Sequence, residues 1–253
     1  MTSIGQIFER TVRKFETREQ LDSADRQAIY DLPYELRTVE ANRYIVREGD
    51  RPTRSTLIVD GLAFRQKVTV DGARQILSVH IPGDFVDLEG SLLRYADHNV
   101  QALTRCQVAL VPRDAIVELI RSRGKVAHAM WIDTLIDGSI YREWIVNVGR
   151  RDARAAMCHL LCEFARRLQA SGMGSSGGYE LPMSQEQLGD ALGITPVHVN
   201  RILRELDREG LIEREKRFVR VPNWEKLRKV GGFNENYLHL DQVIPHPLTA
   251  ARA

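Results

Sequence analysis

The sequence has only three cysteines in 253 residues and no long apolar run. Cys106, Cys158 and Cys162 cannot build the disulfide framework of a small secreted protein, which favours a reducing compartment. No segment reaches the roughly 18 uncharged apolar residues that a membrane-spanning helix needs. The first twenty residues mix both charge signs and lack the apolar core of a signal peptide. We therefore predict a cytoplasmic protein that is not associated with a membrane.

The sequence also lacks the motifs that catalysis and metal binding require. It contains no pairing of nucleophile and base, no metal-ligand spacing and no glycine-rich phosphate loop. Asp84, Asp87 and Glu89 could be mistaken for an acid/base cluster, but Asp84 lies in a structural corner, and carboxylates near a turn are usually solvated. Cys158 and Cys162 lie four residues apart and could chelate a metal or respond to oxidant, but small buried side chains are the commoner case. We predict no catalytic residue, no metal and no cofactor.

Charge is nearly balanced overall but uneven along the chain. The formal net charge is +2, with 20 Lys/Arg against 21 Asp/Glu in residues 1–149 and 15 against 11 in residues 150–230. A basic segment is the pattern expected of a surface that contacts nucleic acid. An ordinary solvated helical surface would show the same excess, so charge only permits DNA binding.

The first half of the chain is typical of an antiparallel β-barrel or β-roll. After a stretch of expected short helices over residues 6–40, short β-type runs alternate with turn signals. The runs are 44–46, 55–59, 64–68, 75–79 and 108–111, and the turns are Glu48-Gly49-Asp50, Asp60-Gly61, Asp71-Gly72 and Pro82-Gly83-Asp84. Many short strands without βαβ alternation predict a closed or rolled sheet.

After Pro112 the pattern becomes helical. We expect a short helix capped by Asp114 and ending near Gly124, then a long helix over 125–148 and another over 151–170. The apolar residues of the long helix cover more than one face, as needed for packing on both its own domain and a partner. Burial within one monomer is the alternative. Residues 171–178, rich in glycine and serine, predict a flexible loop.

Residues 179–222 predict a winged helix-turn-helix. Ser184 and Gln187 have the spacing of a capping box, and Gly193 suits the tight turn between two helices. Thr195-Pro196 caps and begins the second helix, which Gly210 ends. We expect Val199, Ile202, Leu203 and Leu206 of this helix to face inward. A hairpin with strands over 211–214 and 218–221 follows, around residues 215–217. The second helix of this motif can enter the major groove of DNA.

Over about residues 25–225 the chain resembles the Crp/Fnr family of transcription regulators. The resemblance lies in Ile45–Asp50, Leu57–Gly61, Ile81–Phe85, Met183–Gly193 and Thr195–Leu211. It implies an α+β fold: an N-terminal antiparallel β-roll (double-stranded β-helix), a long dimerisation helix and a C-terminal winged helix-turn-helix. It further implies a homodimer that binds a palindromic operator in double-stranded DNA and recruits or blocks RNA polymerase.

This organisation divides the chain into four expected segments. A β-roll sensor or effector domain with its leading helices occupies residues 1–117, and the dimerisation helix region occupies 118–149. The winged helix-turn-helix occupies 150–230. The tail, 231–253, is either partly disordered or docked on the dimer.

The resemblance also indicates which residues contact DNA. Arg201 matches the family's recognition arginine, whose fork suits guanine O6 and N7. Val197 stands where the family often has a glutamate, so the operator should differ from the best-known ones, and His198 or Asn200 could take over part of the readout. A phosphate contact or plain exposure is the alternative for His198, and a solvated hairpin tip is the alternative for the wing. The predicted DNA-binding residues are Ser184, Gln185, Thr195, Val197, His198, Asn200, Arg201, Lys216 and Arg217.

The signal that the β-roll senses stays open at the sequence level. In family members that bind cyclic AMP, a Gly-Glu pair holds the ribose and an Arg-Ser or Arg-Thr pair holds the phosphate. Here the first pair falls on Asp87-Leu88, with Glu89 one place late, and no such pair lies between Arg94 and Gln101. The candidate effector pocket comprises Asp87, Leu88, Glu89 and Arg94, and we do not expect it to bind cyclic AMP. Control by the protein's own abundance and control by an unidentified small molecule in the β-roll are the remaining alternatives. The chain has three cysteines and none before Cys106, so a four-cysteine iron–sulfur cluster is excluded by count.

Two other classes of protein fit parts of the pattern. One is a metal-dependent, cupin-like β-barrel enzyme with a helical appendage, which needs a histidine set on adjacent strands. His80 alone does not supply that set. His80 and His98 could be haem or metal ligands, but they lack a clear partner set, and we expect His80, in a strand-like run, to be structural. The other is a protein-interaction module whose winged helix binds protein instead of DNA.

Overall fold

The computed structural model describes residues 7–173 and 178–240. Within these ranges the chain forms two compact units. The first comprises residues 7–65, 80–138 and 239–240, and the second comprises 66–79, 139–173 and 178–238. No helix in the described ranges is long and apolar enough to cross a membrane.

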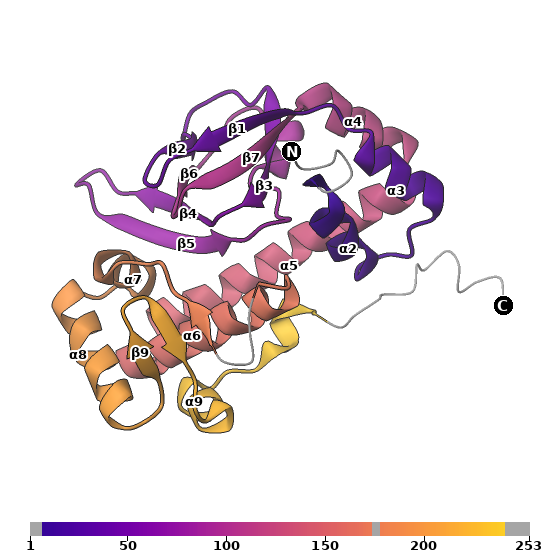
Figure 1. The fold of residues 1–253 in the computed structure, drawn as a ribbon. Helices are drawn as coiled ribbons and strands as arrows, with labels where there is room; N and C mark the ends of the chain where they lie inside the picture. The colour runs from indigo at the N-terminus through magenta and orange to yellow at the C-terminus, as the bar shows by residue number, and fades with distance from the viewer. Residues whose placement is uncertain (1–6, 174–177, 241–253) are drawn as a thin grey trace. The chain divides into compact units, whose positions relative to one another are not determined.

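Seven strands in the first half of the chain form two sheets (Figure 1). One sheet has three strands in the order β1-β7-β3, and the other has four in the order β2-β6-β4-β5. The pairs of β7 with β1 and β3, and of β2 with β6, are antiparallel. The predicted antiparallel β-roll and α+β class are confirmed. The strands are β1 (Glu35–Val39), β2 (Tyr44–Val46), β3 (Arg54–Asp60), β4 (Ala63–Val68), β5 (Arg74–His80), β6 (Asn99–Ala102) and β7 (Cys106–Pro112).

The core of the roll depends on paired strand residues and on a Gly-Asp corner. Leu57 on β3 lies opposite Ala109 on β7, and both are fully buried. At the corner, the Gly83 amide donates to the Ile58 carbonyl at 2.8 Å, and the Ile58 amide donates to the Asp84 carbonyl at 2.9 Å. The Asp84 carboxylate accepts from the Ile81 amide at 3.0 Å, so Asp84 holds the corner together.

Two expectations for the first unit are wrong. Residues 6–40 are only partly helical: α2 (Glu9–Glu16) and α3 (Ser23–Tyr30) are followed by strand β1. β1 is mostly exposed and so carries little apolar periodicity; its strand character comes from pairing with β7. Asp114 does not cap α4 (Arg113–Ser122), because the chain passes directly from β7 into the helix and Pro112 occupies the cap position. Asp114 lies in the first turn instead, where a negative charge favours the helix dipole.

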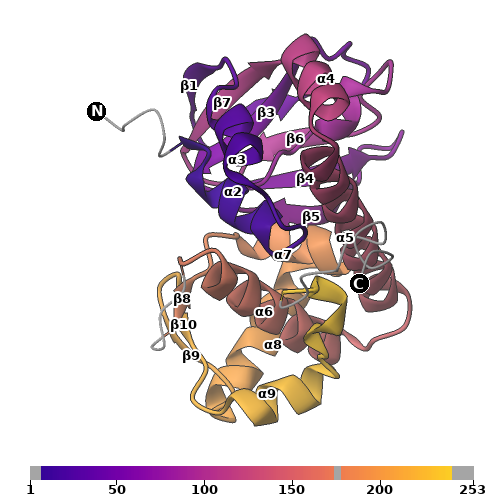
Figure 2. The same ribbon diagram turned by 90° about the vertical axis from the view of Figure 1, so that its right-hand side faces the viewer.

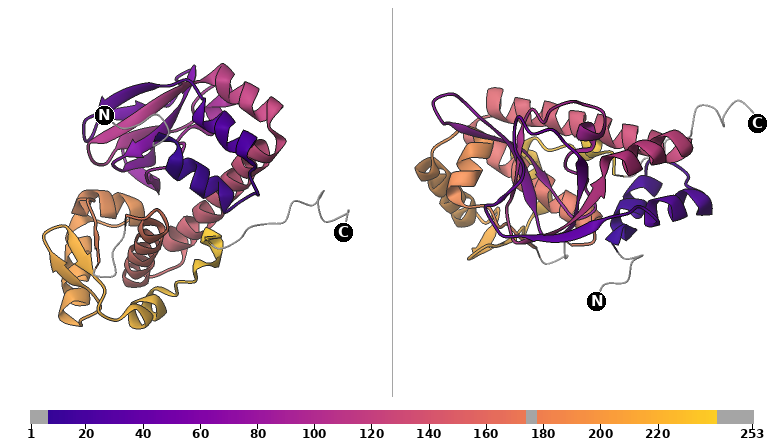
Figure 3. Two further views of the ribbon diagram at one scale, coloured as in Figure 1. Left: turned by 45° about the vertical axis from the view of Figure 1, so that its right-hand side comes forward. Right: turned by 90° about the horizontal axis from the view of Figure 1, so that it is seen from above.

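The long helix α5 (Gly124–Gly149) runs unbroken, close to the predicted range (Figure 3). Its buried apolar residues recur at helical spacing along one side: Val126, Ala129, Ile132, Ile136, Ile140 and Trp144. Trp131, Leu135, Ile145 and Val146 are exposed and fall within about 100° of arc on the opposite side, at 3.6 residues per turn, while Val148, also exposed, lies outside this arc. The structure thus gives α5 a second apolar face that residues 7–173 and 178–240 leave uncovered.

The second unit contains a helix-turn-helix followed by a small sheet in the order β8-β10-β9 (Figure 2). Its elements are α6 (Ala153–Ala170), β8 (Tyr179–Glu180), α7 (Gln185–Leu192), α8 (Pro196–Arg208), β9 (Glu213–Glu215), β10 (Phe218–Arg220), α9 (Trp224–Gly231) and the 3-10 turn η2 (Glu235–Leu238). The hairpin strands are shorter than expected, because Leu211 and Ile212 are buried after α8 before the strand begins. Residues 174–177 of the predicted flexible loop lie outside the described residues.

The chain after the wing packs on α6, which the sequence left open. Gly231 lies so close to α6 that a Cβ there would meet the His159 backbone nitrogen at 2.7 Å. The Glu163 carboxylate of α6 accepts from the Tyr237 hydroxyl at 2.7 Å and from the Trp144 indole N–H at 3.0 Å. Burial raises the pKa of Glu163. Residues 241–253 lie outside the described residues.

Candidate nucleic-acid interface

The ends of α7 and α8 are fixed by the local chemistry that the sequence predicted. The Ser184 hydroxyl accepts from the Gln187 amide at 3.1 Å, and the Gln187 side chain accepts from the Ser184 amide at 2.8 Å. Gly193 ends α7 in the left-handed region, with φ of 67°. The Thr195 hydroxyl accepts from the His198 amide at 3.3 Å, and Pro196 occupies the first turn of α8. These caps fix where each helix starts and therefore which side chains α8 exposes.

One side of α8 anchors the helix and the other is open to solvent. Val199, Ile202, Leu203 and Leu206 are buried, as predicted. The turn from α7 to α8 is tight, since a Cβ on Gly189 would lie 2.5 Å from the Ile194 carbonyl oxygen. The buried residues and the tight turn therefore fix the position of α8, and with it the orientation of its exposed side.

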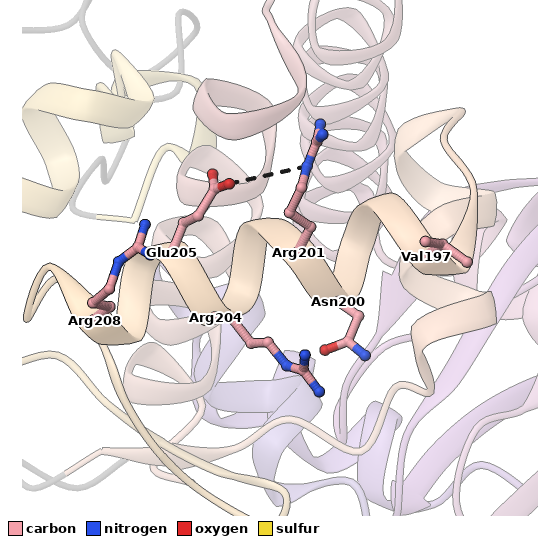
Figure 4. A pocket seen from close by; sticks show the side chains of 6 residues that line it. All are labelled: Val197, Asn200, Arg201, Arg204, Glu205 and Arg208. Carbon is pink, nitrogen blue, oxygen red and sulfur yellow. Dashed lines mark ion pairs between the residues drawn. The ribbon is translucent and has the colours of Figure 1, made fainter.

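The exposed side of α8 forms an open hollow of about 340 Å³, lined by Val197, Asn200, Arg201, Arg204, Glu205 and Arg208 (Figure 4). Three arginines against one glutamate make the hollow positive. In Figure 4, Arg201 and Glu205 lie along one edge of the helix, and Asn200 and Arg204 along the other. Arginine forks and a carboxamide are the donors and acceptors that read base edges and phosphates.

Arg201 is held in place but remains open to a ligand. Its side chain is 67% exposed, and its Nε lies 3.9 Å from the Glu205 carboxylate. One terminal nitrogen of its guanidinium lies 2.9 Å from Nε2 of His198. Both neighbours lie on α8 itself, so they orient the guanidinium along the helix surface while leaving other donors available.

The predicted DNA-binding residues fall in three places. Thr195, Val197, His198, Asn200 and Arg201 come together in the N-terminal half of α8. Ser184 and Gln185 are exposed at the start of α7. Lys216 and Arg217 form the exposed turn between β9 and β10, where Lys216 has a φ of 55°.

The sequence assignment did not include Arg204 and Arg208, which line the same hollow. Their outward direction follows from the helical period. The signal that identifies them is the arginine spacing 201, 204 and 208, since residues three, four and seven apart share one helix face.

The expected effector residues are engaged within the roll. The Asp87 carboxylate is buried and accepts from the Thr56 amide at 2.6 Å and from the Thr56 hydroxyl at 3.2 Å. Leu88 and Glu89 begin the 3-10 turn η1 (Leu88–Ser91). Glu89 accepts from the Arg65 guanidinium at 3.0 Å.

Arg94 differs from the other three in being exposed. Its guanidinium lies 5.3 Å from the centre of the Tyr95 ring. Asp87 and Glu89 therefore take part in internal contacts, and Arg94 faces solvent.

Burial raises the pKa of Asp87 to about 7, from an ordinary value of 3.8. Folding then takes up a proton between about pH 4 and pH 7, so this group lowers the free energy of unfolding as pH rises through that window. Asp87→Asn removes the titration and keeps an acceptor for the Thr56 amide. The unfolding free energy of this variant minus that of the wild type should rise by about 2 kcal/mol as pH increases from 5 to 8. Urea denaturation of both proteins at pH 5 and pH 8 measures these unfolding free energies. The same change with pH in wild type and variant would contradict the titration of Asp87.

The cysteines and histidines that the sequence offered as metal ligands lie in the interior. Cys158 and Cys162 are fully buried, and burial raises the pKa of the Cys158 thiol to about 12. His80 and His98 are also buried. Within residues 7–173 and 178–240, no three His, Cys, Asp or Glu side chains are grouped so that they could hold a metal ion.

Comparison with known proteins agrees with both halves of the fold. Residues 36–123 match the family described as cyclic nucleotide-binding domain, and residues 155–230 match the Crp-like helix-turn-helix domain. The nitrogen fixation regulation protein FixK of Bradyrhizobium diazoefficiens is 30% identical over 173 residues, covering 66% of this chain and 70% of FixK. The chain belongs to the Crp/Fnr family of transcription regulators.

Other Crp/Fnr proteins support the same assignment. The transcriptional activator protein FnrL of Cereibacter sphaeroides is 29% identical over 215 residues, covering 83% of this chain and 86% of FnrL. The solved structure of FixK2 from Bradyrhizobium japonicum superposes with a TM-score of 0.74 at 25% identity, covering 80% of this chain and all of FixK2. Crp/Fnr proteins are DNA-binding transcription regulators that typically act as dimers, and the family is not one of enzymes. The cupin-like enzyme is thereby set aside.

Proposed function

We propose that this Crp/Fnr protein binds a palindromic operator as a homodimer, with one α8 in the major groove at each half-site, and so recruits or blocks RNA polymerase. The observation that carries the proposal is the exposed, arginine-rich side of α8 above its buried anchor. A helix held in this way presents its N-terminal side chains to base edges. Residues 1–117, 118–149 and 150–230 serve sensing, dimerisation and DNA binding.

The proposed contacts divide by chemistry. Arg201 donates to guanine O6 and N7, while Asn200, His198 and Thr195 lie close enough on α8 to contact neighbouring base edges or phosphates. Ser184 and Gln185 lie at the start of α7, where a phosphate is favoured by the helix dipole. Lys216 and Arg217 of the wing, with Arg204 and Arg208 of α8, supply phosphate contacts that set position without reading sequence.

The proposed dimer uses the uncovered face of α5. Trp131 is 63% exposed and Ile145 is 69% exposed in the single chain, although both are large and apolar. A second α5 packed against this face would remove it from water. A two-fold axis between two α5 helices would also relate two copies of α8, which matches the symmetry of a palindrome.

We propose that cyclic AMP is not the effector and that the regulator needs no cofactor. The Asp87 carboxylate lies where the family's ribose-binding pair is expected. The Arg65 guanidinium already donates a hydrogen bond to Glu89. An anionic ligand would meet these carboxylates and would have to displace Glu89. The three cysteines are free and buried, which fits the reducing cytoplasm in which we propose that the protein acts.

Salt dependence of binding to duplex DNA tests this function against a protein-binding role. Arg204, Arg208, Lys216 and Arg217 give eight cations per dimer, and each phosphate contact contributes about −0.9 to the slope of log affinity against log salt. We expect a slope between about −4 and −7 by fluorescence anisotropy. A slope near zero would contradict DNA binding through this surface.

A further inference from the structure

Val197 is an exposed apolar side chain in the first turn of the recognition helix. It is 81% exposed. Among the described residues between Ala153 and Leu238, it is the only exposed large apolar side chain. The other side chains that line the hollow on α8 are polar or charged.

Folding gives no reason for a valine at this position. The helix start is capped by Thr195 and begins with Pro196, and the inner face begins at Val199. Val197 belongs to neither, so its side chain contributes little to the stability of the unit. Valine is also a poorer helix former than many polar residues. An exposed apolar side chain on a binding surface stabilises a complex when a partner covers it and removes it from water.

The position of Val197 relative to Arg201 limits what that partner is. The two residues are four apart on one helix, so their side chains share a face. One helical turn rises about 5.4 Å, whereas successive base pairs lie about 3.4 Å apart. With Arg201 on a guanine, Val197 faces a base pair one or two steps away.

The chemistry of the major groove then selects the base. Valine offers neither a donor nor an acceptor, so it cannot pair with the cytosine amino group or with guanine O6 and N7. The thymine C5-methyl group is the apolar group that the groove displays. Placing a methyl group against Val197 removes apolar surface of both from water.

We propose that Val197 is a specificity-determining residue that contacts the C5-methyl group of a thymine one or two base pairs from the guanine read by Arg201. This inference rests on the proposed function, because it requires α8 to lie in the major groove. It predicts a thymine, not only a guanine, at fixed positions in each half-site.

Replacing single thymines of the operator with deoxyuridine tests the contact, because this removes only the C5-methyl group. The operator comes from selection on randomised duplex DNA, and each thymine is replaced symmetrically in both half-sites. At one position, deoxyuridine should lower the affinity of the wild-type protein about fourfold per half-site, which is about 0.8 kcal/mol. The two half-sites together should then lower the affinity of the dimer about 15-fold. Val197→Ser should bind the thymine and deoxyuridine operators within about twofold of each other.

Two further variants sharpen the test. Val70→Ser, at an exposed valine on the β4–β5 turn, should keep the wild-type deoxyuridine penalty. Val197→Glu introduces a hydrogen-bond acceptor. In this variant, selection should favour a base pair with an accessible cytosine amino group at that position instead of thymine.

The outcomes separate this inference from the proposed function. Tight operator binding with no deoxyuridine penalty, or an equal penalty in wild type and Val197→Ser, would overturn the contact and leave the function standing. Failure of wild type to bind any selected operator would overturn both.

Discussion

Arg201→Ala is expected to lower affinity for the selected operator about 100-fold. A bidentate arginine–guanine pair contributes about 1–3 kcal/mol, and each dimer makes two such pairs. A loss of about 1.4 kcal/mol per half-site is tenfold, and two half-sites multiply. The fold should survive, because the Arg201 side chain is 67% exposed and its contacts, with His198 and Glu205, lie on the same helix. Anisotropy titrations at fixed salt measure the change.

Arg201→Lys distinguishes base reading from charge. Lysine keeps the positive charge but lacks the planar fork, so it should retain affinity for random duplex and lose operator preference. Arg105→Ala is the matched charge control, since Arg105 is an exposed arginine on the β-roll that pairs with Glu40. If Arg201→Ala still preferred the operator over random duplex as strongly as the wild type does, the assignment of Arg201 to base reading would be contradicted.

Ile145→Glu is expected to convert the dimer into a monomer and to abolish operator binding at nanomolar concentrations. Two-fold symmetry places the substitution twice in one interface, and disruption of a central apolar contact costs about 2 kcal/mol or more per copy. A monomer reads one half-site and loses the additional affinity of the second. Trp131→Glu, on the same face of α5, should act in the same way. Light scattering coupled to size-exclusion chromatography gives the mass directly.

The control for the dimer variants is Leu92→Glu, which places the same charge on an exposed leucine of the β-roll. It should remain a dimer and bind the operator as wild type does. Thermal unfolding of all three variants checks that the chains are folded. A dimer of wild-type mass and affinity in Ile145→Glu would contradict the role of this α5 face.

Features that depend on local chemistry could be read from the sequence. The capping box of Ser184 and Gln187, the Gly193 turn and the Thr195-Pro196 start are set by side chains within four residues of each helix end. For that reason the recognition helix and its inward residues were predicted in position. The β-roll was predicted from turn signals, which are also local.

Features that depend on distant partners could not be read from the sequence. Strand β1 exists because it pairs with β7 some 70 residues later, and its exposed residues show no alternating apolar pattern. Helix α9 packs on α6 through Gly231, whose closeness to His159 no sequence pattern indicates. The raised pKa of Asp87 likewise comes from burial by segments far away in the chain, and it stays raised although the hydrogen bonds from Thr56 lower it.

In the proposed dimer, two copies of α8 read a palindrome. The most direct test is selection of bound sequences from randomised duplex DNA with purified protein alone. We predict enrichment of a palindrome whose half-sites each contain a guanine and whose centres lie roughly one helical turn, about 10 base pairs, apart. Enrichment of a single non-palindromic site, or of no sequence at all, would contradict it.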